Sequence, residues 1–256
     1  MRVLVTFAVD AEFAPWRKLR NLKRRQVDGV VVHEAKIGRA EVDFVVTGMG
    51  IDNAASATRS VLKNEHDFCV ASGFAGSLQP NFKVGDILAA EAVQFLGKSK
   101  ILQSNRNLAR HAEGDGAIFA KMLITADHVV RTPAEKSALA PFAEFVDMES
   151  FGVFTAAHEI GRPAVAIRVI SDAHDGELPV NVELTMNKKG QVQIGRVVRF
   201  LARYPSTLPA LIRLGRDSRT AAEALAAFLE AYIKKISFFT HGWYPEGENL
   251  EKLVAR

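Results

Sequence analysis

AVAIRVISD, residues 164–172, begins with an apolar run of strand length and ends on polar side chains. Continuous apolar runs of this kind are typical of strands that are buried on both faces of a sheet. Similar runs recur along the chain and alternate with segments of helical pattern, which predicts a layered α/β fold around a mostly buried sheet. The expected strands cover residues 3–8, 30–35, 42–47, 68–72, 87–93, 118–124 and 164–170.

Segments with a helical pattern lie between these runs or follow them. The expected helices cover residues 52–63, 149–158, 195–204 and 221–236. Asp52 and Asn53 open the first of them, where we expect their side-chain oxygens to cap free backbone N–H groups. Pro133 marks another helix start, because its missing N–H costs nothing in a first turn. Residues 176–190 indicate a loop over a site or a linker.

Length and composition predict one main domain. The chain of 256 residues is 48% hydrophobic, which allows a single large core. We expect this domain to cover residues 1–236, with a C-terminal extension over residues 237–256. The formal net charge of +4 is a weak argument for a polyanionic partner. The basic cluster at residues 17–25 has no aromatic partner beyond Trp16, so we interpret it as a solvated helix and turn and expect no nucleic-acid partner.

Cysteine usage and the N-terminus bear on the compartment. Cys69 is the one cysteine and lies in an apolar run, where a small buried hydrophobe is a better interpretation than a nucleophile or a ligand. The apolar N-terminus meets Asp10 and Glu12 too soon for a signal peptide or a membrane span. We therefore expect a cytoplasmic protein without stable membrane insertion.

Polar groups and glycines gather where expected strands end, which is where open α/β sheets bind ligands. Asp10 and Glu12 follow the first strand. Residues 47–50 (TGMG) and 72–78 (SGFAGSL) follow two others, and their glycines let backbone N–H groups approach an anion or a sugar. Purely structural roles also stay open. The carboxylates could interact favourably with the dipole of a helix N-terminus, and the glycines could be required by tight turns.

A second group of polar side chains follows two later strands. Glu149 opens a helix, and Arg168, Ser171 and Asp172 lie at the end of the next strand. With Glu12, the chain offers carboxylates from three separate segments at strand ends, a set suited to acid–base chemistry on a polar ligand. A buried salt bridge between Arg168 and Glu149 is the structural alternative.

Common cofactor motifs are missing from the sequence. The dinucleotide fingerprint that Gly48 and Gly50 could begin needs glycine or alanine at position 53, where Asn53 stands. Neither the phosphate-binding P-loop motif nor the HExxH zinc motif occurs, and the seven histidines do not cluster with carboxylates at ligand spacing. Metal chemistry and nucleoside-triphosphate chemistry therefore lose most of their support.

Five segments together resemble one family, the nucleosidase branch of the nucleoside phosphorylase superfamily and especially its 5′-methylthioadenosine/S-adenosylhomocysteine nucleosidases. They are residues 8–12 (AVDAE), 47–55 (TGMGIDNAA), 72–87 (SGFAGSLQPNFKVGDI), 146–149 (VDME) and 168–172 (RVISD), in the family's order and at similar distances. The resemblance covers roughly residues 1–175. It implies a three-layer α/β/α sandwich around a mixed, partly closed β-sheet, assembled as a homodimer that uses no metal and no organic cofactor.

The resemblance also implies a reaction, hydrolysis of the N-glycosidic bond of a purine nucleoside such as a 5′-substituted adenosine. The aspartate matching Asp172 helps protonate N7 of the leaving base, and the glutamate matching Glu149 binds the ribose hydroxyls. The glutamate matching Glu12 positions and deprotonates the attacking water, and the arginine matching Arg168 supports it. The other substrate-binding residues implied are Ala8, Met49, Phe74, Ala75, Gly76, Val129, Met148 and Ser171.

The chemistry is consistent with these roles. A purine leaves more readily when it is protonated, and the cation-like ribosyl transition state needs negative charge and a nucleophile nearby. An acid at Asp172 would have to hold its proton near neutral pH, which burial in a mostly apolar pocket could arrange.

Two departures from the family pattern concern the sugar side of the pocket. Phe74 stands where the family has a serine, and Ser77 where it has a glycine. The segment between residues 93 and 118 lacks the long aromatic and acidic stretch that helps to form the 5′ pocket. The 5′ substituent and the purine therefore stay open, and residues 176–190 and the C-terminal extension could fill the gap.

Two other functions remain alternatives. A phosphorylase would need cationic or hydroxyl groups around phosphate, and residues 47–53 and 72–78 contain no arginine, although Arg59 and Ser77 keep that possibility open. Glu12, as a candidate base, favours water. A nucleoside-binding protein that has lost catalysis is the second alternative, and Phe74 is the feature that suggests it.

Overall fold

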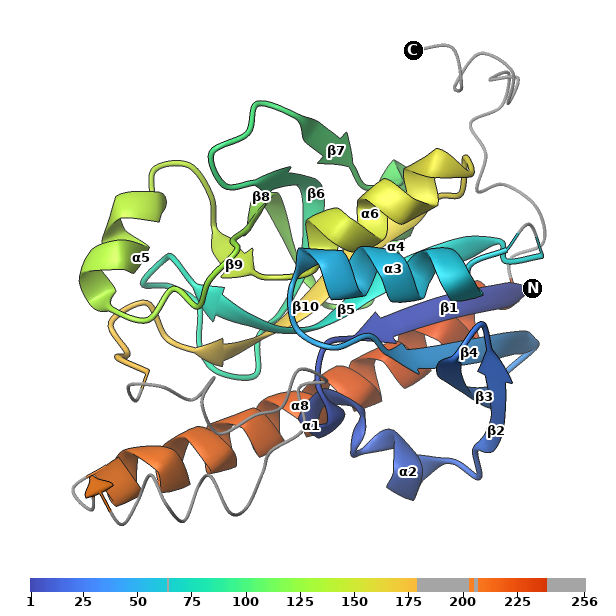
Figure 1. The fold of residues 1–256 in the computed structure, drawn as a ribbon, viewed down its shortest axis with the longest axis horizontal. Coiled ribbons are helices and arrows are strands. Elements are labelled where there is room, and N and C mark those ends of the chain that lie inside the picture. Colours follow the sequence, from blue (N-terminus) through green and yellow to red (C-terminus); the bar gives the residue numbers. More distant parts are fainter. Residues whose placement is uncertain (64, 179–202, 205–206, 239–256) are drawn as a thin grey trace.

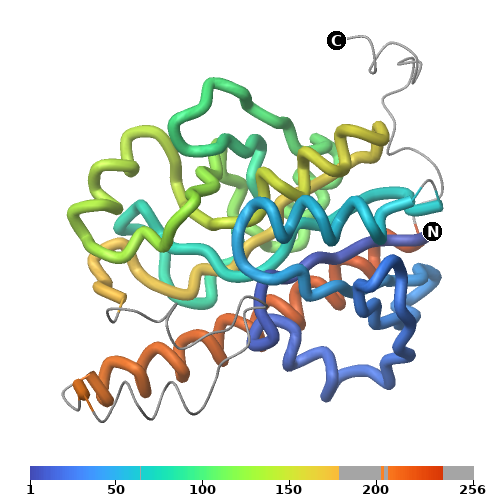
Figure 2. Tube along the Cα trace, in the orientation of Figure 1, coloured from blue at the N-terminus to red at the C-terminus, as the bar shows by residue number. Residues whose placement is uncertain are grey.

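A computed structural model describes residues 1–63, 65–178, 203–204 and 207–238 of the chain (Figures 1 and 2). Its strands are β1 (Arg2–Phe7), β2 (Lys23–Val27), β3 (Val30–Ile37), β4 (Ala40–Val46), β5 (Phe68–Ser77), β6 (Ile87–Phe95), β7 (Ile101–Gln103), β8 (Ile118–Thr125), β9 (Phe145–Asp147) and β10 (Ala164–Asp172). Its helices are α1 (Asp10–Phe13), α2 (Trp16–Leu19), α3 (Ile51–Val61), α4 (Arg106–Gly114), α5 (Pro133–Leu139), α6 (Ser150–Glu159) and α8 (Leu208–Ile236).

The strands form one mixed sheet that partly closes on itself. Their order is β10-β6-β8-β9-β5-β1-β4-β3-β2, with β7 paired to β6. Because β10 also pairs with β5, the strands β5, β9, β8, β6 and β10 complete a ring, and β1, β4, β3 and β2 extend the sheet outside it. The mixed, partly closed sheet expected from the sequence is confirmed.

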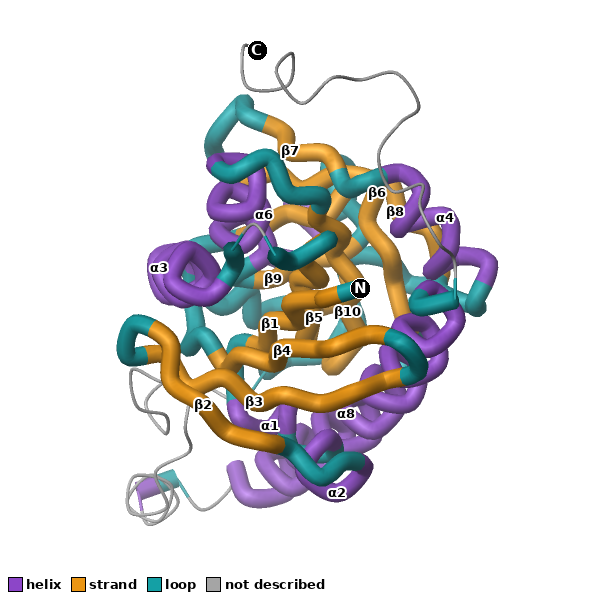
Figure 3. The backbone as a smooth tube through the Cα atoms, turned by 90° about the vertical axis from the view of Figure 1, so that its right-hand side faces the viewer, coloured by secondary structure: helices purple, strands orange, loops and turns teal. Residues whose placement is uncertain are grey.

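Helices cover both faces of this sheet, and the strand sequences show why. In β1, Val3, Val5 and Phe7 belong to one core cluster with α8 and α4, whereas Leu4 belongs to a second cluster with α3 and α6. Successive side chains of a strand point to opposite faces, so a strand with apolar side chains on both faces must be covered on both. Figure 3 shows α3 and α6 on one side of the strands and α8 on the other.

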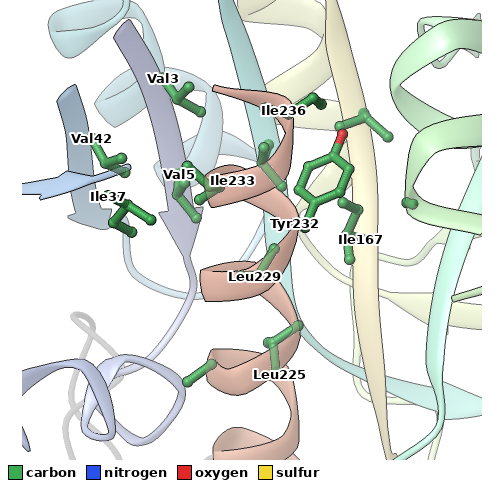
Figure 4. Close-up of a cluster of buried hydrophobic side chains, with 14 of the residues drawn as sticks. Val3, Val5, Ile37, Val42, Ile167, Leu225, Leu229, Tyr232, Ile233 and Ile236 are labelled. Atoms are coloured by element: carbon green, nitrogen blue, oxygen red, sulfur yellow. The ribbon is translucent and has the colours of Figure 1, made fainter. Parts of the chain in front are cut away.

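Helix α8 closes one of these two cores. Its buried side chains pack on the strands (Figure 4) and include Leu225, Leu229, Tyr232, Ile233 and Ile236. Their spacing of three and four residues places them on one helix face. The sequence predicted this helix over residues 221–236, and the structure extends it back to Leu208, where Pro209 is tolerated in the first turn.

The predicted cap of α3 is wrong. The helix begins at Ile51, so Gly50 is its N-cap residue, and no side chain caps it there. Asp52 and Asn53 lie one and two positions inside the first turn instead, and the Asn53 amide donates a hydrogen bond to the Met49 carbonyl at 2.7 Å. The N–H of Gly50 donates a hydrogen bond to Glu149, at the start of α6.

The basic cluster at residues 17–25 is only partly a helix and turn. Helix α2 covers its start, but Lys23–Val27 is strand β2, paired antiparallel with β3 at the edge of the sheet. An edge strand with exposed polar side chains lacks the apolar run on which the sequence-based strand assignment depended. Arg25 there pairs with the buried Asp43 at 2.7 Å, so part of the cluster has a structural role.

Strand β5 is longer than predicted, because it includes the glycine segment that follows residue 72. Gly73 still pairs with Arg168 of β10, and Gly76 pairs with both β10 and β9. Gly73 has φ +132°, a conformation that only glycine adopts readily. The glycines therefore continue the strand into the region where the site lies.

Several expectations fall partly or wholly outside the described residues. These are most of the 176–190 loop, most of the helix at 195–204, and the C-terminal extension after residue 238. Among the helices that are described, none combines the length and apolar character that crossing a membrane requires. Cys69 is fully buried and burial raises the pKa of its thiol, which confirms its interpretation as a core residue.

Candidate active site

The ends of several strands meet around one cavity. Strands β1, β4, β5 and β10 run parallel, so their carboxyl ends lie at the same edge of the sheet. A cavity of about 460 Å³ opens there. Its walls include these residues named in the sequence analysis: Ala8, Glu12, Met49, Phe74, Ala75, Gly76, Val129, Met148, Glu149, Ser171 and Asp172. Three acidic side chains from distant segments thus share one cavity.

Arg168 is the predicted site residue that does not line the cavity. Its side chain is 1% exposed, and its guanidinium lies 2.6 Å from the Asp147 carboxylate and 3.9 Å from that of Glu149. It also donates to the Ser72 carbonyl at 3.0 Å. The salt bridge between Arg168 and Glu149 is therefore present only as a long contact, and Asp147 is the closer partner.

Asp147 has a role in the site that was not expected from the sequence. Besides Arg168, its carboxylate accepts hydrogen bonds from the Thr125 hydroxyl at 2.7 Å and from the N–H of Ser150 at 3.2 Å. It thus joins β8, β9, α6 and β10 in the wall of the cavity. The only sequence signal was its place next to Met148 and Glu149 in a quoted motif.

Glu12 is held by three backbone N–H groups. Its Oε2 accepts from Ala8 at 2.6 Å and from Val9 at 3.0 Å, and its Oε1 accepts from Phe74 at 2.7 Å. Burial raises the pKa of Glu12, while Arg168 and these N–H groups act in the opposite direction. A fixed, buried carboxylate whose affinity for a proton is increased by burial is suited to act as a base.

The contact between Phe74 and Glu12 bears on the departure from the family pattern. It is made by the main-chain N–H of Phe74, so it does not depend on which side chain stands at this position. The neighbouring Gly73 allows the approach, because a Cβ there would lie 2.5 Å from Glu12 Oε1 and 2.8 Å from the Arg168 guanidinium. The backbone of β5 is thus shaped around the Glu12 carboxylate.

Glu149 stands at the start of α6, facing the N-terminus of α3. Its Oε1 accepts the Gly50 N–H at 2.9 Å. Burial raises the pKa of Glu149 to about 8, an effect that Arg168 opposes and that the nearby Asp147 and Glu12 reinforce. The side chain can therefore hold a proton near neutral pH in the unliganded protein, and it can donate as well as accept hydrogen bonds.

Asp172 has an ammonium partner that was not expected from the sequence. Its Oδ2 lies 2.5 Å from Nζ of Lys136 on α5, and its Oδ1 accepts from the Ser171 hydroxyl at 2.9 Å. Asp172 does line the cavity, as expected, but a buried cation that was not expected lies against its carboxylate. Lys136 carried no sequence signal beyond following a predicted helix start.

Comparison with known proteins assigns the chain to a family. The family model described as the Phosphorylase superfamily matches residues 2–202. The chain belongs to the phosphorylase superfamily.

Similar members of the superfamily have nucleosidase names. The 5′-methylthioadenosine/S-adenosylhomocysteine nucleosidase of Staphylococcus saprophyticus is 24% identical over 199 residues, which cover 67% of this chain and 86% of that protein. The nucleosidase of the same name from Buchnera aphidicola is 24% identical over 208 residues, 72% of this chain and 88% of that protein.

Solved structures show the same fold. The 5′-methylthioadenosine/S-adenosylhomocysteine nucleosidase of Neisseria meningitidis, in complex with methylthio-immucillin-A, has a TM-score of 0.70 and 20% identity, covering 91% of this chain and 99% of that one. A futalosine hydrolase mutant of Helicobacter pylori has a TM-score of 0.70 and 17% identity, covering 92% and 99%. The layered architecture expected from the sequence is that of the phosphorylase superfamily.

Because the chain belongs to the phosphorylase superfamily, we asked which residues could bind phosphate in the cavity. Arg59 is bound to the Glu159 carboxylate at 2.6 and 2.7 Å, and the Ser77 hydroxyl donates to the Gln79 carbonyl at 2.7 Å. Neither residue lines the cavity. Arg131 does line it, but it belongs to the loop of Val129 rather than to a glycine segment. Within the described part of the chain, no group of three or more His, Cys, Asp or Glu could hold a metal ion.

Proposed function

We propose that this chain hydrolyses the N-glycosidic bond of a purine nucleoside, a 5′-substituted adenosine, to free base and sugar. The observation that carries the proposal is the position of Glu12, Glu149 and Asp172 in the walls of one cavity. Its volume of about 460 Å³ is in the range of small-molecule sites. The nucleosidase names of similar members of the superfamily support the same reaction.

Glu12 is the proposed base that takes a proton from the attacking water. Three N–H contacts hold its carboxylate in one orientation, and burial increases its affinity for a proton. An oriented base removes the need to organise the reacting groups at the moment of reaction. Arg168 lies behind it and balances the negative charge of the buried carboxylates.

Glu149 is the proposed partner of the ribose hydroxyls, with the backbone of Met148 beside it. Both residues line the cavity, and the Gly50 N–H fixes one oxygen of the Glu149 carboxyl group. The negative charge of Glu12, and that of Glu149 once it has released its proton, would stabilise a ribosyl group that becomes cation-like as the bond breaks.

Asp172 is the proposed partner of the purine at N7, with main-chain groups near Val129 touching the base. Ser171 orients the Asp172 carboxylate through its hydroxyl at 2.9 Å. A leaving purine that gains a proton at N7 departs as a neutral molecule, which lowers the barrier to cleavage. Ala8, Met49, Ala75 and Gly76 complete the proposed substrate pocket.

We assign the 5′ substituent of the substrate to the part of the cavity that Leu178 and Leu214 line. Leu178 and, from α8, Leu214 and Ser218 line the cavity in addition to the residues above. Leu178 belongs to the 176–190 segment, which could replace the missing part of the 5′ pocket. Its presence in the wall supports that assignment.

A panel of adenosine derivatives with different 5′ groups, incubated with and without phosphate, tests the proposal. We expect adenine release at equal rates in both conditions, because Glu12 activates water rather than phosphate. A strict requirement for phosphate with a sugar 1-phosphate product would make the protein a phosphorylase, for which the cavity residue Arg131 would be the first candidate anion ligand.

We further propose a cytoplasmic homodimer in which residues 1–236 form the catalytic domain and residues 237–256 an extension. The free, buried Cys69 is compatible with a reducing compartment. The homodimer is the assembly that the family resemblance of the sequence implies. Light scattering coupled to size-exclusion chromatography tests the dimer, and a monomeric mass would refute it.

A further inference from the structure

Lys136 is a charged side chain that the core fully buries. It lies in α5, at the left of Figure 1 near the end of β10, and it is 0% exposed. Its Nζ lies 2.5 Å from Asp172 Oδ2, 2.6 Å from the Ala173 carbonyl and 3.1 Å from the Gly176 carbonyl. The three N–H bonds of an ammonium group thus have three acceptors.

Burying this ammonium group costs free energy, so its partners indicate what the side chain does. A buried ammonium loses its hydration, and only a full set of acceptors with a nearby negative charge offsets that loss. If Lys136 bound only the carbonyls of Ala173 and Gly176, its role would be to hold the loop after β10 in place. The third partner is the carboxylate that we place beside the purine, and Asp172 lies between Lys136 and the cavity, since Asp172 lines the cavity and Lys136 does not.

We propose that Lys136 supplies, through Asp172, the proton that the purine takes up when its glycosidic bond breaks. The inference rests on the proposed nucleosidase function and adds a residue to it. Lys136 acts through another side chain and is a positioning residue that also stores the proton. The Ser171 hydroxyl fixes Oδ1 of Asp172, and Lys136 fixes Oδ2, so the carboxylate is held from two sides.

The step balances in protons and electrons. When the C1′–N9 bond breaks, its electron pair leaves with the purine, and the oxygen of water bonds to C1′ while one water proton passes to Glu12. Asp172 starts as a carboxylate, takes a proton from Nζ of Lys136 and passes a proton to N7 of the purine, so it ends as a carboxylate again. The ammonium becomes an amine, Glu12 becomes a neutral acid, and exchange with solvent restores both after the products leave.

Lys136→Gln and Lys136→Met test the proposal with substrates that do and do not need this proton. Gln keeps N–H donors for Asp172 but has no proton to give, and Met removes the polar group altogether. The substrates are 5′-methylthioadenosine, an N7-methylated purine nucleoside and 4-nitrophenyl riboside, whose last two leaving groups depart without protonation. Lys121→Met, at an exposed position in β8, is the control.

We expect both Lys136 variants to lower kcat for 5′-methylthioadenosine by about 10²- to 10⁴-fold, the usual contribution of general acid catalysis, with KM nearly unchanged. On the two substrates that need no proton they should stay within about fivefold of the wild type. Lys121→Met should match the wild type on all three. Lys136→Gln is the decisive variant, because it separates proton supply from the positioning of Asp172 and retains polar contacts that favour folding.

Two results would overturn the inference while leaving the proposed function intact. One is a Lys136→Gln protein that cleaves 5′-methylthioadenosine at the wild-type rate. The other is an equal loss on all three substrates, which would show a purely structural ion pair. A wild-type protein that releases base from no nucleoside would instead refute the proposed function, and this inference with it.

Discussion

Glu149 is a single residue whose protonation links the site to the stability of the protein. Burial raises the pKa of its carboxyl group from 4.5 to about 8. Between these two values the folded protein keeps a proton that the unfolded chain releases, so the free energy of unfolding falls as pH rises through this window. Below pH 4.5 both states are protonated, and the penalty is absent.

Glu149→Gln should therefore stabilise the protein increasingly as pH rises from 5 to 8. Gln is neutral at every pH and its carbonyl can still accept the Gly50 N–H. We expect its melting temperature to gain several degrees on the wild type at pH 8 relative to pH 5. Thermal unfolding across this range is the measurement, with Glu41→Gln on the exposed part of β4 as the control. Parallel curves for the wild type and Glu149→Gln would show that the pKa is not raised.

Gly73→Ala probes the contact between β5 and Glu12. The new Cβ would lie 2.5 Å from Glu12 Oε1, and φ is +132°, so the carboxylate must move. Gly116→Ala is a matched control, because its φ is +104° but no atom lies within 4 Å. Both variants should lose stability from the strained backbone, whereas only Gly73→Ala should lose about 10²-fold in kcat, the cost of a misplaced catalytic group. Equal kcat values for the two variants would count against a role for Glu12.

At this scale, the sequence predicts acidic residues better than their partners. Glu12, Glu149 and Asp172 stand at strand ends, where the alternation of strands and helices makes them visible. Lys136 gives no such signal, because its partner is 36 residues away in the chain and only the packing of α5 against the end of β10 brings the two together. Whether a carboxylate meets an apolar wall or a cation depends on such packing.

At the scale of elements, α3 and α6 pack closely enough to exclude a methyl group. A Cβ at Gly152 in α6 would lie 2.3 Å from the Ile51 carbonyl oxygen of α3. The same two helix starts carry Gly50 and Glu149, which are joined by a hydrogen bond. The close approach of the helices therefore sets the position of Glu149 in the cavity wall.

Gly152→Ala should destabilise the protein by about 1–3 kcal/mol, the usual cost of overpacking. Alanine would otherwise favour the helix, so the sign of the change reports the clash. Gly114→Ala in α4, with no atom within 4 Å of its new Cβ, should be neutral or slightly stabilising. Urea unfolding midpoints measure both, and a stabilised Gly152→Ala protein would contradict the packing.

The elements that the sequence predicts well are those with strong apolar patterns. Strands β1 and β10 and the C-terminal part of α8 bury large side chains at regular spacing. Strand β2 is not predicted, because it is an edge strand with exposed charged side chains. The predicted strand at β5 is too short, because the last residues of β5 are glycines and small side chains. Pairing with neighbouring strands, rather than side-chain pattern, defines both of these regions.

At the scale of the whole molecule, the α/β class follows from the sequence, whereas the ring does not. Apolar runs show that β5 and β10 are buried, but their hydrogen bonds to each other and to β6, β8 and β9 depend on contacts across the chain. The partly closed sheet was expected through family resemblance. The cavity depends on that closure, because Gly76 of β5 faces Asp172 of β10 there.

The most direct test of the central claim is the rate of adenine release from 5′-methylthioadenosine under single-turnover conditions, with enzyme in excess and saturating. The wild type and Glu41→Gln should release adenine at the same rate, and Glu12→Gln should be about 10²- to 10⁴-fold slower although it still binds the nucleoside. A Glu12→Gln protein as fast as the wild type, or a wild type that binds the nucleoside without releasing adenine, would contradict the account.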